Sequence, residues 1–122
     1  MAKIYRHQIM ELYRRPLNYG TIARPTKKFK GANPFCGDAL EIFVVLDNNQ
    51  KIKTIKWQGQ GCVISQVAAS MFTEIIKGKT LTTAQKIISQ EFIDQLGLEL
   101  SPTRRKCALL PLYTVKEIEI DK

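Results

Sequence analysis

The sequence predicts an α+β domain in which helices pack on a small antiparallel sheet. Three observations lead to this class. The 122 residues, 44% of them hydrophobic and 25% charged, suit one globular domain. Two adjacent segments, 40–46 and 51–57, have the composition of strands, and segments with helical periodicity lie on either side of them. We therefore predict a single domain over residues 1–122, in which residues 1–31 form a basic N-terminal helix and connector. The sequence leaves open whether this segment is ordered or mobile before a partner binds.

The N-terminal quarter predicts a short helix followed by irregular chain. Apolar residues recur at helical spacing over residues 3–14 and predict an amphipathic helix there. Pro16 ends it, because a proline ring and a missing N–H do not continue a helix. Residues 16–35 contain three prolines and two glycines, which predict an irregular connector.

The next segment predicts a β-hairpin. Residues 40–46 are apolar and β-branched, and residues 51–57 alternate polar with apolar side chains. Residues 47–50 read Asp-Asn-Asn-Gln, a composition typical of turns. We expect Gly59 and Gly61 to break the second strand.

The second half of the chain predicts helices. Their expected bounds run from a cap at Ser65 to Gly78, from a cap at Thr82 or Thr83 through Ile88 with a further turn over 92–96, and from Ser101-Pro102 through Ile118. Pro111 lies inside the last of these, four residues after Cys107, and we expect it to kink that helix.

Charge is concentrated at the N-terminus. The net charge is +8, and residues 1–31 hold eight Lys or Arg against one acid, whereas residues 32–122 hold eleven against ten. Such a basic segment binds nucleic acid or an acidic surface by long-range attraction, or it is only solvated. Its aromatic residues form no recognisable stacking motif, so a zinc-stabilised nucleic-acid-binding module is kept only as a remote alternative.

Other sequence features favour a cytoplasmic protein. No apolar run reaches the roughly 18–20 residues of a membrane span, and no apolar signal segment follows Met1. Three cysteines are an odd number and do not suit a disulfide framework. We expect the thiols to stay reduced.

The three cysteines lie at breaks between predicted elements. Cys36 and Asp38 flank a glycine at the entry to the first strand, Cys62 precedes a helix, and Cys107 lies in the first turns of the last helix. Three thiolates and one carboxylate would form a tetrahedral site for zinc or iron. Three inert buried cysteines are one alternative. A nucleophilic pair of a cysteine with His7, the only histidine, is another.

Four segments resemble one known family. They are Asn33-Pro-Phe-Cys-Gly-Asp38, Gly59-Gln-Gly-Cys62 with the small-residue segment to Met71, Pro102-Thr-Arg-Arg-Lys-Cys107 with the residues to Leu110, and Met10 to Gly20, where Leu12 replaces the usual histidine. Together they resemble the IscU/SufU/NifU-N-terminal family of iron–sulfur cluster assembly proteins over nearly the whole chain.

The resemblance implies a SufE/NifU-like α+β fold with a sheet of about three strands. It also implies that Cys36, Asp38, Cys62 and Cys107 converge as metal ligands at one exposed end. Members of the family either hold zinc and accept persulfide sulfur from a cysteine desulfurase of the SufS or IscS type, or assemble a transient two-iron cluster. In the first case Cys36 accepts the sulfur when the desulfurase displaces Asp38, and Arg104 stabilises the developing charge.

The partners implied are that desulfurase and recipient apo iron–sulfur proteins or further assembly proteins. The chain is then a partner of an enzyme rather than a stand-alone enzyme. A degenerate member with only a structural or regulatory role is a further alternative.

The motifs favour the SufU branch over the IscU branch, with one exception. Lys106 stands where IscU members have histidine, and Leu100-Ser-Pro-Thr-Arg104 replaces the Leu-Pro-Pro-Val-Lys segment that binds a dedicated Hsp70 chaperone, so that chaperone is not expected as a partner. However, only 44 residues separate Cys62 from Cys107, close to the IscU spacing, and the usual SufU insertion is missing. Sulfur acceptor and scaffold both remain open at this point.

Overall fold

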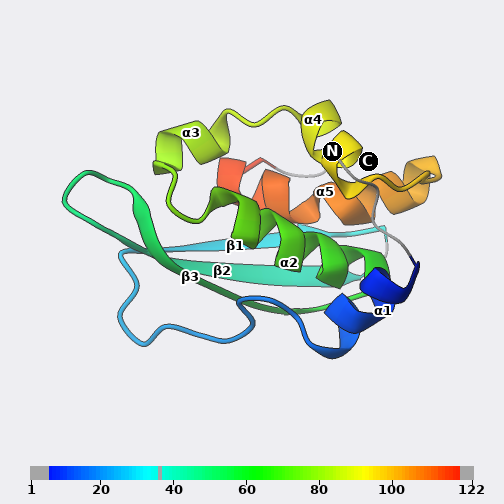
Figure 1. Cartoon of the computed structure of the whole chain (residues 1–122), viewed down its shortest axis with the longest axis horizontal. Coiled ribbons are helices and arrows are strands. Elements are labelled where there is room, and N and C mark those ends of the chain that lie inside the picture. Colours follow the sequence, from blue (N-terminus) through cyan, green and yellow to red (C-terminus); the bar gives the residue numbers. More distant parts are fainter. Residues whose placement is uncertain (1–5, 36, 119–122) are drawn as a thin grey trace.

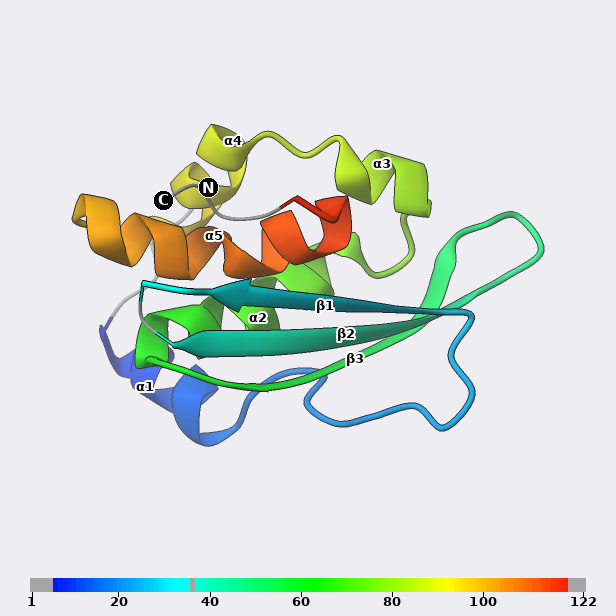
Figure 2. The same ribbon diagram turned by 180° about the vertical axis from the view of Figure 1, so that it is seen from behind.

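A computed structural model describes residues 6–35 and 37–118. Its elements are, in order, α1 (Arg6–Arg14), β1 (Lys27–Asn33), β2 (Asp38–Leu46), β3 (Ile52–Gln60), α2 (Val63–Ile76), α3 (Leu81–Gln85), α4 (Ser89–Leu96) and α5 (Pro102–Lys116). Helices α2 and α5 cover one face of the sheet, and the other face is turned away from them (Figures 1 and 2). The predicted α+β class is confirmed.

The sheet is antiparallel throughout, in the order β1-β2-β3. At its centre Ile42 lies between Phe29 on β1 and Trp57 on β3, and all three side chains are buried beneath the helices. Residues of α2, α4 and α5 complete this core, including an edge-to-face contact between Phe72 and Phe92 with ring centroids 5.2 Å apart.

The prediction of an irregular connector over 16–35 is wrong for its second half, which contains β1. The strand has four polar residues and a glycine among its seven, so its pattern is weak, and only pairing with β2 reveals it. Gly31 faces α5 in this strand, and a Cβ there would meet Thr114. Closer to the N-terminus, residues 18–20 pair with the free edge of β3: Gly20 N–H donates to Trp57 O at 2.8 Å, and Trp57 N–H donates to Asn18 O at 2.9 Å.

The predicted hairpin is confirmed, but both strands are longer than expected. Gly59 does not break β3. It pairs with Leu40, and a Cβ at position 59 would meet the backbone of Ala39, so the glycine permits a close approach of the two strands. The longer strands bring Asp38 and the residues after Gln60 to the same end of the sheet.

The helices begin at other caps than expected, with one exception. Cys62, not Ser65, is the N-cap of α2, and the Ser65 hydroxyl instead donates back to the Cys62 carbonyl at 3.0 Å. The cap of α3 is Thr80, one turn before Thr83, whose N–H it accepts. The predicted start at Ser101 is confirmed, because its hydroxyl accepts the N–H of Arg104 at 3.2 Å.

Two helix ends also differ from expectation. Helix α3 stops at Gln85 and α4 begins only at Ser89, so the helix predicted through Ile88 is shorter. Helix α5 runs through the buried Pro111 and ends at Lys116, because Glu117 adopts a left-handed conformation with φ of 59°. Among the helices of residues 6–35 and 37–118, none has the length and apolar character to cross a membrane.

Candidate metal centre

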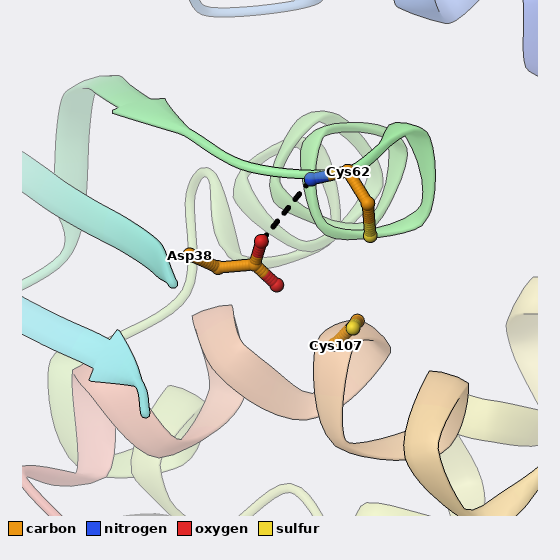
Figure 3. Close-up of side chains that lie close together, drawn as sticks. All are labelled: Asp38, Cys62 and Cys107. Carbon is orange, nitrogen blue, oxygen red and sulfur yellow. Dashed lines mark hydrogen bonds between the residues drawn. The ribbon is translucent and has the colours of Figure 1, made fainter. Parts of the chain in front are cut away.

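Three predicted ligands come from three different elements and meet at one end of the sheet. Asp38 is the first residue of β2, and the antiparallel pairing of Ala39 with Gln60 places it beside the chain that leaves β3 for Cys62. Helix α5, which packs on α2, β1 and β2, brings Cys107 to the same point. Figure 3 shows the two sulfurs facing one another beside the Asp38 carboxylate.

The three side chains form a compact donor set. One ligand atom from each of Asp38, Cys62 and Cys107 lies within 4.8 Å of the other two. Asp38 and Cys107 are each only 2% exposed, and Cys62 is half-buried. The N–H of Cys62, at the start of α2, donates to Asp38 Oδ1 at 3.1 Å, where the helix dipole also favours negative charge.

The second carboxylate oxygen of Asp38 shows that these residues fit a metal ion. Asp38 Oδ2 is buried and has no hydrogen-bond partner among the described residues. A buried, unpaired carboxylate oxygen is costly, and a cation beside it removes that cost. Two sulfurs and one oxygen match the donor preferences of zinc and iron. The thiol and carboxylate donors of Asp38, Cys62 and Cys107 thus fit a metal ion.

Gly61 allows the ligands to approach this closely. A Cβ at position 61 would meet the Asp38 carboxylate and would lie 2.6 Å from Ser65 Oγ. Any larger residue would therefore push the carboxylate away from Cys62. This lack of space explains why the second glycine of the Gly-x-Gly-Cys segment, Gly61, has no side chain.

The fourth predicted ligand, Cys36, lies outside the described residues. The residues on either side of it are anchored, since Phe35 N–H donates to Asn33 Oδ1 at 3.1 Å and Gly37 N–H donates to Asn33 O at 3.0 Å. Gly37 has φ of +71°, a conformation that favours glycine. The place of Cys36 in the ligand set remains a prediction.

Three consecutive cations precede Cys107 on α5, and they differ in what they contact. Arg105 reaches α4, where its guanidinium donates to Gln90 Oε1 at 2.8 Å. The Lys106 ammonium lies 3.9 Å from the centroid of the Phe35 ring. Arg104 is exposed, and within the described part of the chain its guanidinium makes no hydrogen bond or ion pair. The predicted role of Arg104 remains a prediction.

Asn33 is a site residue that the sequence reasoning missed. Its side chain is fully buried, and its Nδ2 donates to Cys107 Sγ at 3.6 Å across 74 residues of sequence. Asn33 fell in the irregular connector predicted over 16–35 and had no predicted role of its own. The available signal was its position at the start of the Asn-Pro-x-Cys-Gly-Asp segment.

Fold and site together define a class of protein: a small α+β domain that gathers cysteine sulfurs and one carboxyl group at the end of its sheet. The family of NifU-like N-terminal domains matches residues 4–118. The chain belongs to this family, which comprises iron–sulfur cluster assembly scaffolds, and the predicted resemblance is confirmed.

Two curated relatives represent both branches. The zinc-dependent sulfurtransferase SufU of Bacillus subtilis is 35% identical over 124 residues, covering 88% of this chain and 83% of SufU. The iron–sulfur cluster assembly scaffold protein IscU 1 of Archaeoglobus fulgidus is 30% identical over 118 residues, covering 97% of this chain and 76% of IscU 1.

A solved structure agrees with the fold. The crystal structure of FiSufU from Fervidobacterium islandicum AW-1, a candidate assembly scaffold of the SUF system, superposes with a TM-score of 0.75 at 28% identity. The match covers 93% of this chain and 95% of that one. The expected SufE/NifU-like fold is confirmed.

Proposed function

We propose that this chain accepts persulfide sulfur from a cysteine desulfurase at a zinc site made of Cys36, Asp38, Cys62 and Cys107. The observation that carries the proposal is the buried Asp38 Oδ2, which has no described partner and lies beside two cysteine sulfurs. Zinc, when bound, keeps coordinating thiols deprotonated at neutral pH. The name of the Bacillus subtilis relative, a zinc-dependent sulfurtransferase, supports the same chemistry.

Asp38 is the ligand best suited to leave. A single carboxylate is a harder and weaker ligand for a soft site than a thiolate. Its Oδ1 already accepts the Cys62 N–H, so the released carboxylate keeps one hydrogen bond inside the protein. Asp38 is therefore the ligand that we expect the desulfurase to displace, and the desulfurase must supply a partner for the released Oδ2.

The transfer step is a thiol exchange at sulfur. The Cys36 thiolate attacks the terminal sulfur of the desulfurase persulfide, and a new S–S bond forms on Cys36. The bond between that sulfur and the desulfurase cysteine breaks, and the desulfurase cysteine leaves as a thiolate. No electrons are gained or lost overall, so no external reductant or oxidant is needed.

Arg104 is the cation we assign to this step. Arg105 and Lys106 are engaged with Gln90 and Phe35, whereas the exposed Arg104 guanidinium has no such contact within the described residues. It lies one helical turn before Cys107, on the same side of α5. A guanidinium there attracts the anionic persulfide and lowers the energy of the charged transition state.

The alternative function is that of a scaffold for a two-iron cluster. The 44-residue spacing between Cys62 and Cys107 favours it, and so does the IscU relative that covers 97% of this chain. Iron and sulfide would then be the cargo, which the chain passes to recipient apo-proteins. We place either activity in the cytoplasm, where thiols stay reduced.

Alanine production by the cognate cysteine desulfurase separates the two functions. The assay is run with and without the zinc-loaded chain and without added reductant. For a sulfur acceptor we expect strong stimulation that disappears with Cys36→Ala, while Asn49→Ser, in the turn at the other end of the sheet, behaves like the parent. Little stimulation by the parent would instead favour the scaffold.

A further inference from the structure

Asn33 occupies a special position beside the metal centre. It is the last residue of β1 and pairs with Asp38 across the sheet, so both side chains point to the helix-covered face. Its exposed fraction is 0%. A fully buried amide at the edge of a metal site needs a hydrogen-bond partner for each of its polar ends.

The hydrogen bonds of Asn33 link two ligand-bearing segments. Its Oδ1 accepts the N–H of Phe35 at 3.1 Å, and its main-chain oxygen accepts the N–H of Gly37 at 3.0 Å. Its Nδ2 donates to Cys107 Sγ on α5 at 3.6 Å. One side chain thus binds the main chain of Phe35 and the sulfur of Cys107 at the same time.

A hydrogen bond from an N–H donor changes the metal bonding and the nucleophilicity of a cysteine sulfur. The hydrogen bond withdraws electron density from the sulfur, which tunes its bonding to a metal and makes it a weaker nucleophile. Cys107 is also nearly inaccessible, with 2% exposure. By contrast, Cys62 is half-buried, and its sulfur accepts no hydrogen bond from the described residues.

We propose that Asn33 is a positioning residue that keeps Cys107 as a permanent metal ligand and excludes it from sulfur acceptance. The proposal rests on the proposed function, because it concerns which cysteine receives the sulfur. The incoming persulfide then goes to a cysteine that lacks this donor, and the metal is retained through Cys107 during transfer.

The test uses Asn33→Ser. A serine at this position can still accept the N–H two residues later, as asparagine does, and so preserves the turn. Its side chain is too short to reach Cys107 Sγ. The matched control is Asn49→Ser in the exposed turn between β2 and β3, which lies at the opposite end of the sheet.

The first readout is the absorption spectrum of the cobalt(II)-loaded protein, which does not depend on activity. Loss of the N–H donor raises electron donation from sulfur, so the sulfur-to-cobalt charge-transfer band of Asn33→Ser should move to lower energy. The ligand-field bands should keep their intensity, because the ligand set is unchanged. Asn49→Ser should match the parent. An unmoved charge-transfer band in Asn33→Ser would overturn the proposal.

The second readout is the location of persulfide after incubation with the desulfurase and cysteine, mapped by mass spectrometry of cysteine-containing peptides. In the parent we expect almost none on Cys107. In Asn33→Ser its share should rise about fivefold, the effect of removing one ordinary hydrogen bond. Persulfide on Cys107 of the parent would overturn the proposal.

The two readouts separate this proposal from the proposed function. If no cysteine of the parent carries persulfide, sulfur acceptance is wrong, while a shifted cobalt band still supports Asn33 as the residue that holds the Cys107 sulfur. If Asn33→Ser fails to fold, Asn33→Asp serves instead, because it keeps the acceptor for Phe35 and replaces the donor by an oxygen. The same direction of band shift is expected, and its absence would count against the proposal.

Discussion

An aspartate stands at each end of strand β2, and the two carboxylates have different surroundings. Asp47, just after the strand, accepts the N–H of Asn49 at 2.8 Å and the N–H of Lys51 at 3.0 Å. Asp38, at the start of the strand, is buried and has one oxygen with no hydrogen-bond partner among the described residues. The Asp47 carboxylate receives its hydrogen bonds from its own turn, whereas the Asp38 carboxylate keeps one oxygen without a partner among the described residues.

This difference distinguishes the end of β2 that has a structural role from the end that carries the candidate site. Leaving a buried polar group unpaired costs on the order of 2 kcal/mol or more, so a fold retains such a group where a ligand completes it. The turn after β2 needs nothing beyond the local chain. The other end of β2 places Asp38 beside Cys62 and Cys107, and this group of side chains fits a metal ion.

The largest effect is expected from Asp38→Ala. Removing a ligand should weaken zinc binding by more than about 100-fold, because even residues that only support a ligand are worth 10–100-fold. Competition with a chromophoric chelator measures this. Asp47→Ala, its counterpart at the other end of β2, should bind zinc like the parent. Equal affinities for the two variants would remove Asp38 from the ligand set and erase the contrast between the two ends.

The next largest effect on zinc binding is expected from substituting a glycine, with a second glycine as the control. A methyl group at Gly61 would meet the Asp38 carboxylate, so Gly61→Ala should weaken zinc binding about tenfold. It should also cost about 1–3 kcal/mol of stability through overpacking. Gly78, after α2, has φ of +85° and open space around it. Gly78→Ala should therefore cost only about 1 kcal/mol of backbone strain.

Urea unfolding of the metal-free variants and chelator competition measure both quantities. Gly78→Ala should retain the zinc affinity of the parent, which makes it the control for a general loss of stability. A normal zinc affinity in Gly61→Ala would show that the carboxylate tolerates displacement from Cys62, contrary to the tight geometry of the site.

Local signals predicted the elements whose ends are encoded nearby. Ser101-Pro102 starts α5 as expected, and the Asp-Asn-Asn-Gln turn closes the hairpin as expected, because each depends on contacts within a few residues. Strand β1 was missed because its lysines and glycine give little periodicity. Its conformation depends on pairing with β2 and on the approach of α5 at Gly31.

In the candidate site, too, some residues were predicted from local sequence and one was not. Residue types and motif order predicted Asp38, Cys62 and Cys107, and the structure brings them together. Asn33 was not predicted because its bond to Cys107 joins residues 74 positions apart, and nothing in the local sequence around Asn33 specifies that partner. Spacing along the chain indicates candidate metal ligands, whereas residues that contact these ligands from distant parts of the sequence are found only in the packed structure.

The smallest effect is expected in the pH dependence of stability. The backbone N–H groups of Lys51 and then Asn49 lower the pKa of Asp47 below its usual 3.8. A carboxyl group whose pKa is lower in the folded state stabilises the fold above its unfolded pKa, and this contribution is lost as the pH falls through the folded pKa. Asp47→Asn keeps an acceptor for the turn but does not titrate.

The melting temperature of Asp47→Asn should therefore fall slightly less than that of the parent between about pH 5 and 3. Part of the decline should remain, because hydrogen bonds from Gln58 and from Lys77 lower the pKa values of Glu41 and Glu74 in the same direction. Zinc affinity at neutral pH should not change. An identical acid dependence in both proteins would mean that the Asp47 hydrogen bonds persist in the unfolded chain, so this end of β2 would be set by local sequence before the sheet forms.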